Sequence, residues 1–252
     1  MHWTYLLIDI YHTFEGALVT PPNLTLVYGA FAGIIPALFW LWFWLQEDKL
    51  HPEPRSRIMM AFLGGMVLVP LVYFPEKLAF EHFGASPMTF FVWAMVEEGF
   101  KFAMAWLVAL RTRDYDEPID ALEYLITVAL GFSALENTLF ILNPLLVGSG
   151  IQAVITTNMR FVGASLLHVV CSGILGYCIA CEFYRPLWGK ISWRVFGLAL
   201  AITLHTAFNL FIIYDNGSKT FFVFGCVWAM ALCLLLLFEK AKNVRRQSSL
   251  NS

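Results

Sequence analysis

The sequence predicts an all-α protein that crosses a lipid bilayer several times. Of its 252 residues, 59% are hydrophobic and only 13% are charged, and its mean hydropathy is +0.69. Ordinary soluble domains have about 45–50% apolar residues. Several apolar stretches reach the ~20 residues that a helix needs to cross roughly 30 Å of hydrocarbon, whereas the strands of a membrane barrel are about 10 residues long and alternate in polarity. We therefore expect a polytopic transmembrane helix bundle.

The first expected element is an N-terminal amphipathic helix at the membrane surface. Apolar residues recur at helical spacing from Trp3 to Leu18, with acidic and histidine residues between them, and Pro21 and Pro22 end the element. Such a segment is typical of an interfacial helix rather than a span. Seven apolar spans then follow, at about 24–45, 58–80, 88–110, 119–145, 158–183, 193–214 and 220–238.

Lysine and arginine are distributed unevenly over the connecting loops. The loops at 46–57, 111–118 and 185–194 and the C-terminal tail hold twelve of them, whereas the alternate loops hold only Lys77 and Lys219. Short cytoplasmic loops accumulate basic residues, so we expect the N-terminus outside and the C-terminus in the cytoplasm of a plasma-membrane protein. The expected organisation is an interfacial segment (1–22), one transmembrane catalytic domain (23–239) and a basic cytoplasmic tail (240–252).

Charge and cysteine content exclude other classes of protein. The net charge of −2 gives no basic footprint for nucleic acid, and the apolar composition makes the lipid bilayer the expected partner. The five cysteines are an odd number and lie in or beside apolar runs, which argues against a disulfide framework.

Ionisable residues inside the spans are informative, because an Asp, Lys or Arg costs roughly 2.5–3.5 kcal/mol at a helix centre. Four of the expected spans carry polar sets, which are Glu97, Glu98 and Lys101; Glu136 and Asn137; Arg160 and His168; and His205 and Asn209. Lys101 follows the two glutamates by four and three residues, so it can offset their charge on one helix face. His205 and Asn209 also share a face.

The predicted depth of these residues suggests that they meet. Counted from the outer ends of alternately directed spans, Glu97, Glu136, His168 and His205 are each about nine or ten residues deep. At 1.5 Å per residue, all four lie roughly 13–15 Å below the outer surface. Independent core residues would not be expected to share one level.

Two kinds of chemistry fit this set. A glutamate beside histidines can deprotonate a water molecule, with His205 and Asn209 stabilising the developing oxyanion. Alternatively, His168, His205 and Glu98 could hold Zn²⁺ as a metalloprotease does, although no helix carries an H-E-x-x-H pair. The helical spacing of His205 and Asn209 favours the metal-independent route, and the cofactor, none or zinc, stays open.

Further motifs carry a family resemblance. In chain order, the elements are Asp48-Lys49-Leu50-His51-Pro52-Glu53-Pro54, Glu97-Glu98-x-x-Lys101, Glu117-Pro118-Ile119-Asp120, Gly131-Phe132 with Glu136-Asn137, Arg160 with His168, and Leu204-His205-x-x-x-Asn209. In this order, over roughly residues 30–212, they resemble the PrsW-type intramembrane protease family, within the wider group of CAAX-protease-like membrane hydrolases. His51 stands where that family's D-x-x-E-P-E-P loop usually has glutamate, and Ala121 stands where a glycine commonly follows the aspartate.

The resemblance implies intramembrane proteolysis of a small membrane-anchored substrate, such as an anti-sigma factor, near its extracytoplasmic side. It implies that Glu97, Glu98 and His168 are catalytic and that His205 and Asn209 assist. The candidate site also includes three neighbouring polar residues, which are Lys101, Glu136 and Arg160.

Two other functions remain as alternatives. An ion- or proton-coupled transporter would string polar residues across the whole membrane thickness and break helices near its midplane, whereas these groups gather at one level. A non-enzymatic membrane scaffold of the same fold would not need both glutamates and both histidines.

Overall fold

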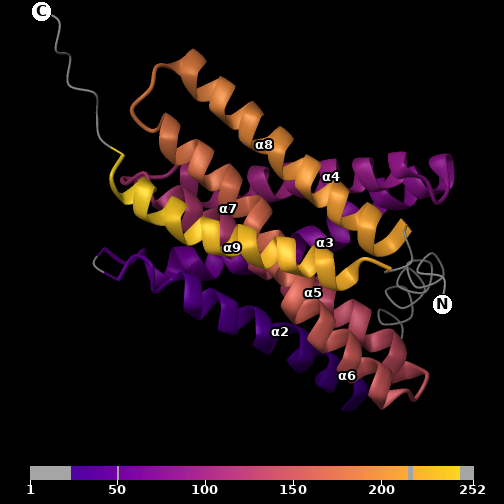
Figure 1. Ribbon diagram of the computed structural model, residues 1–252. Coiled ribbons are helices and arrows are strands. Elements are labelled where there is room, and N and C mark those ends of the chain that lie inside the picture. Colours follow the sequence, from indigo (N-terminus) through magenta and orange to yellow (C-terminus); the bar gives the residue numbers. More distant parts are fainter. Residues whose placement is uncertain (1–23, 50, 215–217, 245–252) are drawn as a thin grey trace, which may run out of the picture.

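The computed structural model describes residues 24–49, 51–214 and 218–244, and within these residues the chain is helical and forms no strand (Figure 1). This confirms the expected all-α polytopic bundle. The amphipathic helix predicted for 1–22 lies outside the described residues.

Eight α-helices and three π-helical segments make up the described part of the chain. The α-helices are α2 (Leu24–Trp44), α3 (Arg55–Phe83), α4 (Pro87–Ala105), α5 (Asp120–Leu146), α6 (Gly150–Met159), α7 (Ser165–Glu182), α8 (Leu187–Asn209) and α9 (Thr220–Lys242). The π-helical segments are η1 (Trp106–Leu110), η2 (Arg160–Ala164) and η3 (Leu210–Tyr214). Because η1 and η3 extend α4 and α8 and η2 joins α6 to α7, the described residues form seven long helical stretches, one for each predicted span.

Six of the helical stretches in the described residues are long and apolar enough to cross a membrane. The seventh, formed by α4 and η1, is long enough for roughly 30 Å of hydrocarbon but carries Glu97, Glu98 and Lys101. All three charged side chains are buried by the neighbouring helices rather than turned outward. The stretch of α4 and η1 is therefore less apolar than the other six because it carries three charged residues of the candidate site.

Two helices begin earlier in the chain than the sequence predicts, so the loops before them are shorter than expected. Helical structure begins at Gly150 rather than 158, and α8 begins at Leu187 rather than 193. In both places the first turns are more polar than the span itself, so a hydropathy pattern marks the apolar part and not the end of the helix. Pro186, whose fixed φ suits the start of a helix, immediately precedes α8.

Helix α5 is the centre of the bundle and is buried on all sides along most of its length. It packs against α2, α3 and α7, while α8 and α9 pack on α7, so that α2 and α8 lie on opposite sides of the molecule (Figure 1). Gly131 of α5 lies against the Phe62 backbone of α3, and Gly65 of α3 lies against the Val128 backbone of α5. Small residues at such crossings let membrane helices approach closely.

Helix α4 packs against α3 and α8 and also contacts α5 and α7. Its buried face therefore meets the polar residues of three other helices at one place. The candidate site lies there.

Candidate functional site

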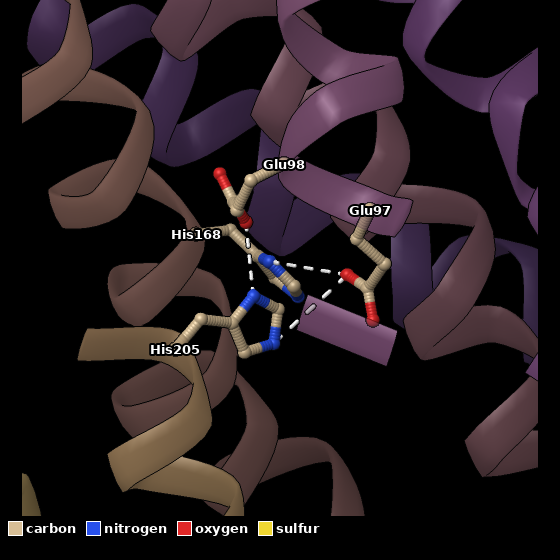
Figure 2. Close-up of side chains that lie close together, drawn as sticks. All are labelled: Glu97, Glu98, His168 and His205. Atoms are coloured by element: carbon tan, nitrogen blue, oxygen red, sulfur yellow. Dashed lines mark hydrogen bonds and ion pairs between the residues drawn. The ribbon is translucent and has the colours of Figure 1, made fainter. Parts of the chain in front are cut away.

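Four buried side chains from three helices converge at this place (Figure 2). Glu97 and Glu98 come from α4, His168 from α7 and His205 from α8. Each offers one ligand atom, and these four atoms all lie within 4.8 Å of one another. The two imidazole rings meet edge to face, with ring centroids 5.2 Å apart. The residues predicted to share one depth are therefore in contact.

Lys101 is the cation of the cluster. Its Nζ donates to Glu97 Oε2 at 3.0 Å, to Glu98 Oε1 at 2.9 Å and to His168 Nδ1 at 2.9 Å. The ammonium also lies over the ring of Phe132, 4.3 Å from its centroid. The predicted charge compensation within α4 is therefore present, and Lys101 additionally binds α4 to α7. Such a fully buried ammonium is tolerated because each of its protons has an acceptor.

These contacts determine which nitrogen of each histidine carries a proton. An ammonium can only donate, so His168 Nδ1 accepts, and the proton of neutral His168 is on Nε2, which lies 3.1 Å from Glu136 Oε2. A carboxylate can only accept, so His205 Nδ1 donates to Glu98 Oε1 at 2.9 Å. Neutral His205 consequently has a free lone pair on Nε2, which lies 4.0 Å from Glu97 Oε2.

A second layer of polar side chains surrounds His168. Arg160 donates to both Glu136 and Asn137, and its guanidinium stacks on Phe140 at 3.7 Å. Arg160 is the first residue of the π-helical segment η2, and π-helical turns are frequent at functional sites because they redirect side chains. Glu136 and Arg160 are the more accessible members of the site, with side chains 20% and 14% exposed. The polar approach to the buried cluster is therefore on their side.

Asn137 connects the second layer to the bundle. Its Nδ2 donates to Ser133 Oγ at 3.1 Å and to Ser165 Oγ at 2.9 Å, and the two hydroxyls lie 2.9 Å apart. This network joins α5 to the start of α7. The buried amide of Asn137 therefore has hydrogen-bond partners for both its nitrogen and its oxygen.

The structure places Asn209 one helical turn beyond His205 and buries it. Among the described residues, its side chain has no hydrogen-bond partner. The predicted site is thus brought together except for Asn209, which makes no hydrogen bond to the cluster in the described part of the chain. Its amide is free to bind a further group.

Sequence reasoning missed three polar residues near the cluster. Glu76 of α3 lies close enough to Glu97 and Glu136 to interact electrostatically with them, and its Oε1 has no partner among the described residues. An acid inside the apolar stretch 58–80 was the signal that could have identified it. Ser133 and Ser165 gave no comparable signal, because hydroxyls in membrane helices commonly bond to their own backbone.

The cluster resembles a zinc site in the type of its donor atoms, but the ammonium of Lys101 lies among them. Two imidazoles and two carboxylates are suitable ligands, and the bond from Glu98 to His205 is of the kind that orients a metal-binding histidine. However, Lys101 Nζ already lies at 2.9–3.0 Å from three of the four donors. A divalent cation within about 4 Å of that ammonium would be repelled by about 8 kcal/mol at an effective dielectric constant of about 20. The two glutamates would attract the same ion, so a metal could bind these donors only after Lys101 moved away or lost its proton.

The sequence of this chain is similar to those of one known protein family. A family model described as "PrsW family intramembrane metalloprotease" matches residues 53–237. Proteins named Protease PrsW are similar to this chain: that of Geobacillus kaustophilus is 31% identical over 58% of this chain and 63% of its own length. Those of Halalkalibacterium halodurans and Shouchella clausii are 23% and 27% identical over 84% and 85% of this chain, and 94% and 96% of their own lengths. No solved structure matches the chain.

Proposed function

We propose, since the chain belongs to the PrsW family of intramembrane metalloproteases, that it hydrolyses a peptide bond of a membrane-anchored protein with a water molecule activated by Glu97. The observation that carries this proposal is the buried cluster of Glu97, Glu98, His168 and His205 around Lys101. A carboxylate held beside histidines in a site of low water content is suited to general-base catalysis.

Glu97 is the better base of the two glutamates. Its side chain is 8% exposed whereas that of Glu98 is fully buried, and its Oε2 faces both histidines at 3.9 and 4.0 Å. Figure 2 shows one oxygen of Glu98 on His205 and the other pointing away from the histidines. Glu98 therefore orients His205 and is not placed to accept a proton from water.

The proposed reaction follows from these positions. Glu97 takes one proton from water, and the resulting hydroxide forms the new C–O bond at the scissile carbonyl carbon. When the C–N bond breaks, the proton held by Glu97 passes to the leaving amine. The protonation pattern makes His205 Nε2 an acceptor for the same water unless the ring is doubly protonated. The amide of Asn209, which can donate, is the better candidate for stabilising the oxyanion.

Lys101 and Glu136 prepare the site for this reaction. Lys101 offsets the charge of both glutamates and holds His168, and Glu136 fixes the other side of the same imidazole. Such preorganisation keeps the charges in place without solvent reorganisation during the reaction. No step in this scheme requires a metal.

The substrate we propose is a small membrane-anchored protein, such as an anti-sigma factor, cleaved near its extracytoplasmic side. The exposed edge of the site at Glu136 and Arg160 and the predicted depth of roughly 13–15 Å from the outer surface support an approach from that side. The basic loops support a plasma-membrane protein with its N-terminus outside and its C-terminus in the cytoplasm.

The test is cleavage of membrane-anchored peptides by the purified protein reconstituted in lipid. Glu97→Gln keeps the shape of the side chain but removes the base, so kcat should fall by at least about 100-fold. Glu98→Gln should also lower kcat, because His205 loses a charged acceptor, and Glu239→Gln at an exposed position is the matched control. Cleavage by Glu97→Gln at the rate of the control would show that Glu97 is not the base.

A further inference from the structure

A second group of acidic residues lies at the opposite end of α5, far from the cluster on α4. Asp48 and Glu53 belong to the connection between α2 and α3, and Asp116, Glu117 and Asp120 lead into α5. Asp120 and Glu136 are separated by about 24 Å along the helix at 1.5 Å per residue. This group, which we call the acidic junction, plays no part in the proposed hydrolysis.

The acidic junction is built around Asp120. One oxygen each from Asp48, Glu117 and Asp120 lies within 4.8 Å of the others, and the same holds for Glu53, Asp116 and Asp120. The Asp120 carboxylate accepts from the backbone N–H of Asp116 at 3.0 Å and of Glu117 at 2.8 Å, which fixes its position. The Glu53 carboxylate beside it accepts a hydrogen bond from the Tyr124 hydroxyl. Carboxylates this close repel one another unless a proton or a cation lies between them.

Asp48 of the acidic junction and Glu123 beside it are buried acids with carboxylate oxygens that lack partners among the described residues, which is an independent sign of a missing ligand. Asp48 is 7% exposed, and its Oδ2 has no hydrogen-bond partner among the described residues. Glu123, 4% exposed and one turn beyond Asp120, has no partner in the same residues for either oxygen. An unpaired buried carboxylate is costly, so such groups are normally paired or bound to a metal.

The basic residues near the acidic junction offset only part of its negative charge. Lys242, whose charge reaches Asp48 and Glu123, is paired with Glu47 at 3.6 Å and Glu239 at 2.6 Å. His51 lies 3.6 Å from Glu117 at an exposed position.

The dipole of helix α5 does not neutralise the negative charge of the acidic junction. The N-terminus of α5 supplies only about half a positive charge to several carboxylates. Burial consequently raises the pKa of the Asp48 and Glu53 carboxyls above their ordinary values. The acidic junction therefore carries more negative charge than His51, Lys242 and the helix end offset.

We propose that the acidic junction binds a hard divalent cation, Mg²⁺ or Ca²⁺. These ions take carboxylate oxygens at about 2.0–2.6 Å, so two oxygens on opposite sides of one ion are separated by about 4–5 Å, which matches the spacing of Asp48, Glu117 and Asp120. An all-oxygen set disfavours zinc, which prefers nitrogen and sulfur. The bound ion ties the connection between α2 and α3 to the start of α5.

Binding and unfolding measurements on the full-length protein in detergent test this proposal. After chelation, titration with Ca²⁺ or Mg²⁺ is expected to raise the unfolding midpoint of the wild type by about 5–10 °C at about one hundred times Kd. Asp120→Asn keeps an oxygen for the backbone N–H groups but removes the shared ligand, so the response should disappear. Glu239→Gln, an exposed acid outside the acidic junction, should respond as the wild type does.

Equilibrium dialysis with ⁴⁵Ca²⁺ provides a readout that does not depend on the stability of a variant. About one saturable Ca²⁺ per chain in the wild type and in His205→Ala, competed by Mg²⁺ and absent from Asp120→Asn, would support the acidic junction as the site. Absence of saturable binding to the wild type would overturn the proposal, since the junction would then be held by shared protons. Undiminished binding to Asp120→Asn would also overturn it.

Discussion

Replacing Lys101 by methionine is expected to destabilise the protein strongly while opening its site to metal. The fully buried ammonium pairs with two carboxylates. Removing one partner of a buried ion pair costs about 3–5 kcal/mol, and the upper end applies because two charges are left unpaired. For a domain of this size each kcal/mol lowers the unfolding midpoint by about 2–4 °C, so Lys101→Met should lower it by about 10–20 °C.

Thermal unfolding in detergent, followed by the exposure of buried cysteines to a thiol-reactive dye, measures this effect. Lys240→Met, at an exposed position in the last turn of α9, is the matched control. The double variant Glu97→Gln with Lys101→Met should be less destabilised than the sum of the single variants, because one stranded charge is also removed. Lys101→Met should bind zinc more tightly than the wild type does. A midpoint equal to that of Lys240→Met, with no gain in zinc affinity, would refute the assigned role of Lys101.

Three further predictions concern packing, the oxyanion and topology. Gly131→Ala should lower the free energy of unfolding by at least about 1–3 kcal/mol, because its new methyl group would overlap the Phe62 backbone. Gly99→Ala, with open space at that position, should leave the unfolding midpoint unchanged or higher. Equal midpoints for the two variants would exclude the close crossing of α3 and α5. Asn209→Ala should lower kcat by about 10²–10³-fold with little change in KM, and an effect confined to KM would place Asn209 in substrate binding instead. In a cysteine-free background, Pro54→Cys should resist an impermeant reagent on intact cells, and labelling there would reverse the topology.

The arrangement of the site could largely be predicted from the sequence, because a membrane limits the possibilities. Charged residues are costly in hydrocarbon, so their positions in the spans were informative, and counting residues from the outer surface placed Glu97, Glu136, His168 and His205 together. The structure brings all four into one cluster. Helical spacing also predicted that Lys101 pairs with both glutamates of its own helix.

Other features of the site depend on distances between helices, which the sequence pattern does not give. The link from Lys101 to His168 crosses between helices, and it decides both the protonation of the histidine and whether a metal can enter. The approach of Glu76 depends on how α3 lies against α4. The starts of α6 and α8 were misplaced because hydropathy reports the apolar part of a helix, while hydrogen bonding continues into its polar turns.

The contacts within the acidic junction, at the other end of α5, also could not be predicted from the sequence. The motif with Asp48 and Glu53 and the motif that ends at Asp120 were visible in the sequence only as parts of a family resemblance. Only the fold shows that these acids meet and that Asp48 is buried without a partner for one oxygen.

The most direct test of water activation by Glu97 is cleavage of a membrane-anchored peptide by protein whose metal content is measured in the same sample. After exhaustive chelation, wild-type protein carrying well under one zinc per chain is predicted to retain its kcat, while Glu97→Gln in the same state loses at least about 100-fold. The account would be contradicted if wild-type activity disappeared with the zinc and returned when one equivalent of zinc was added back.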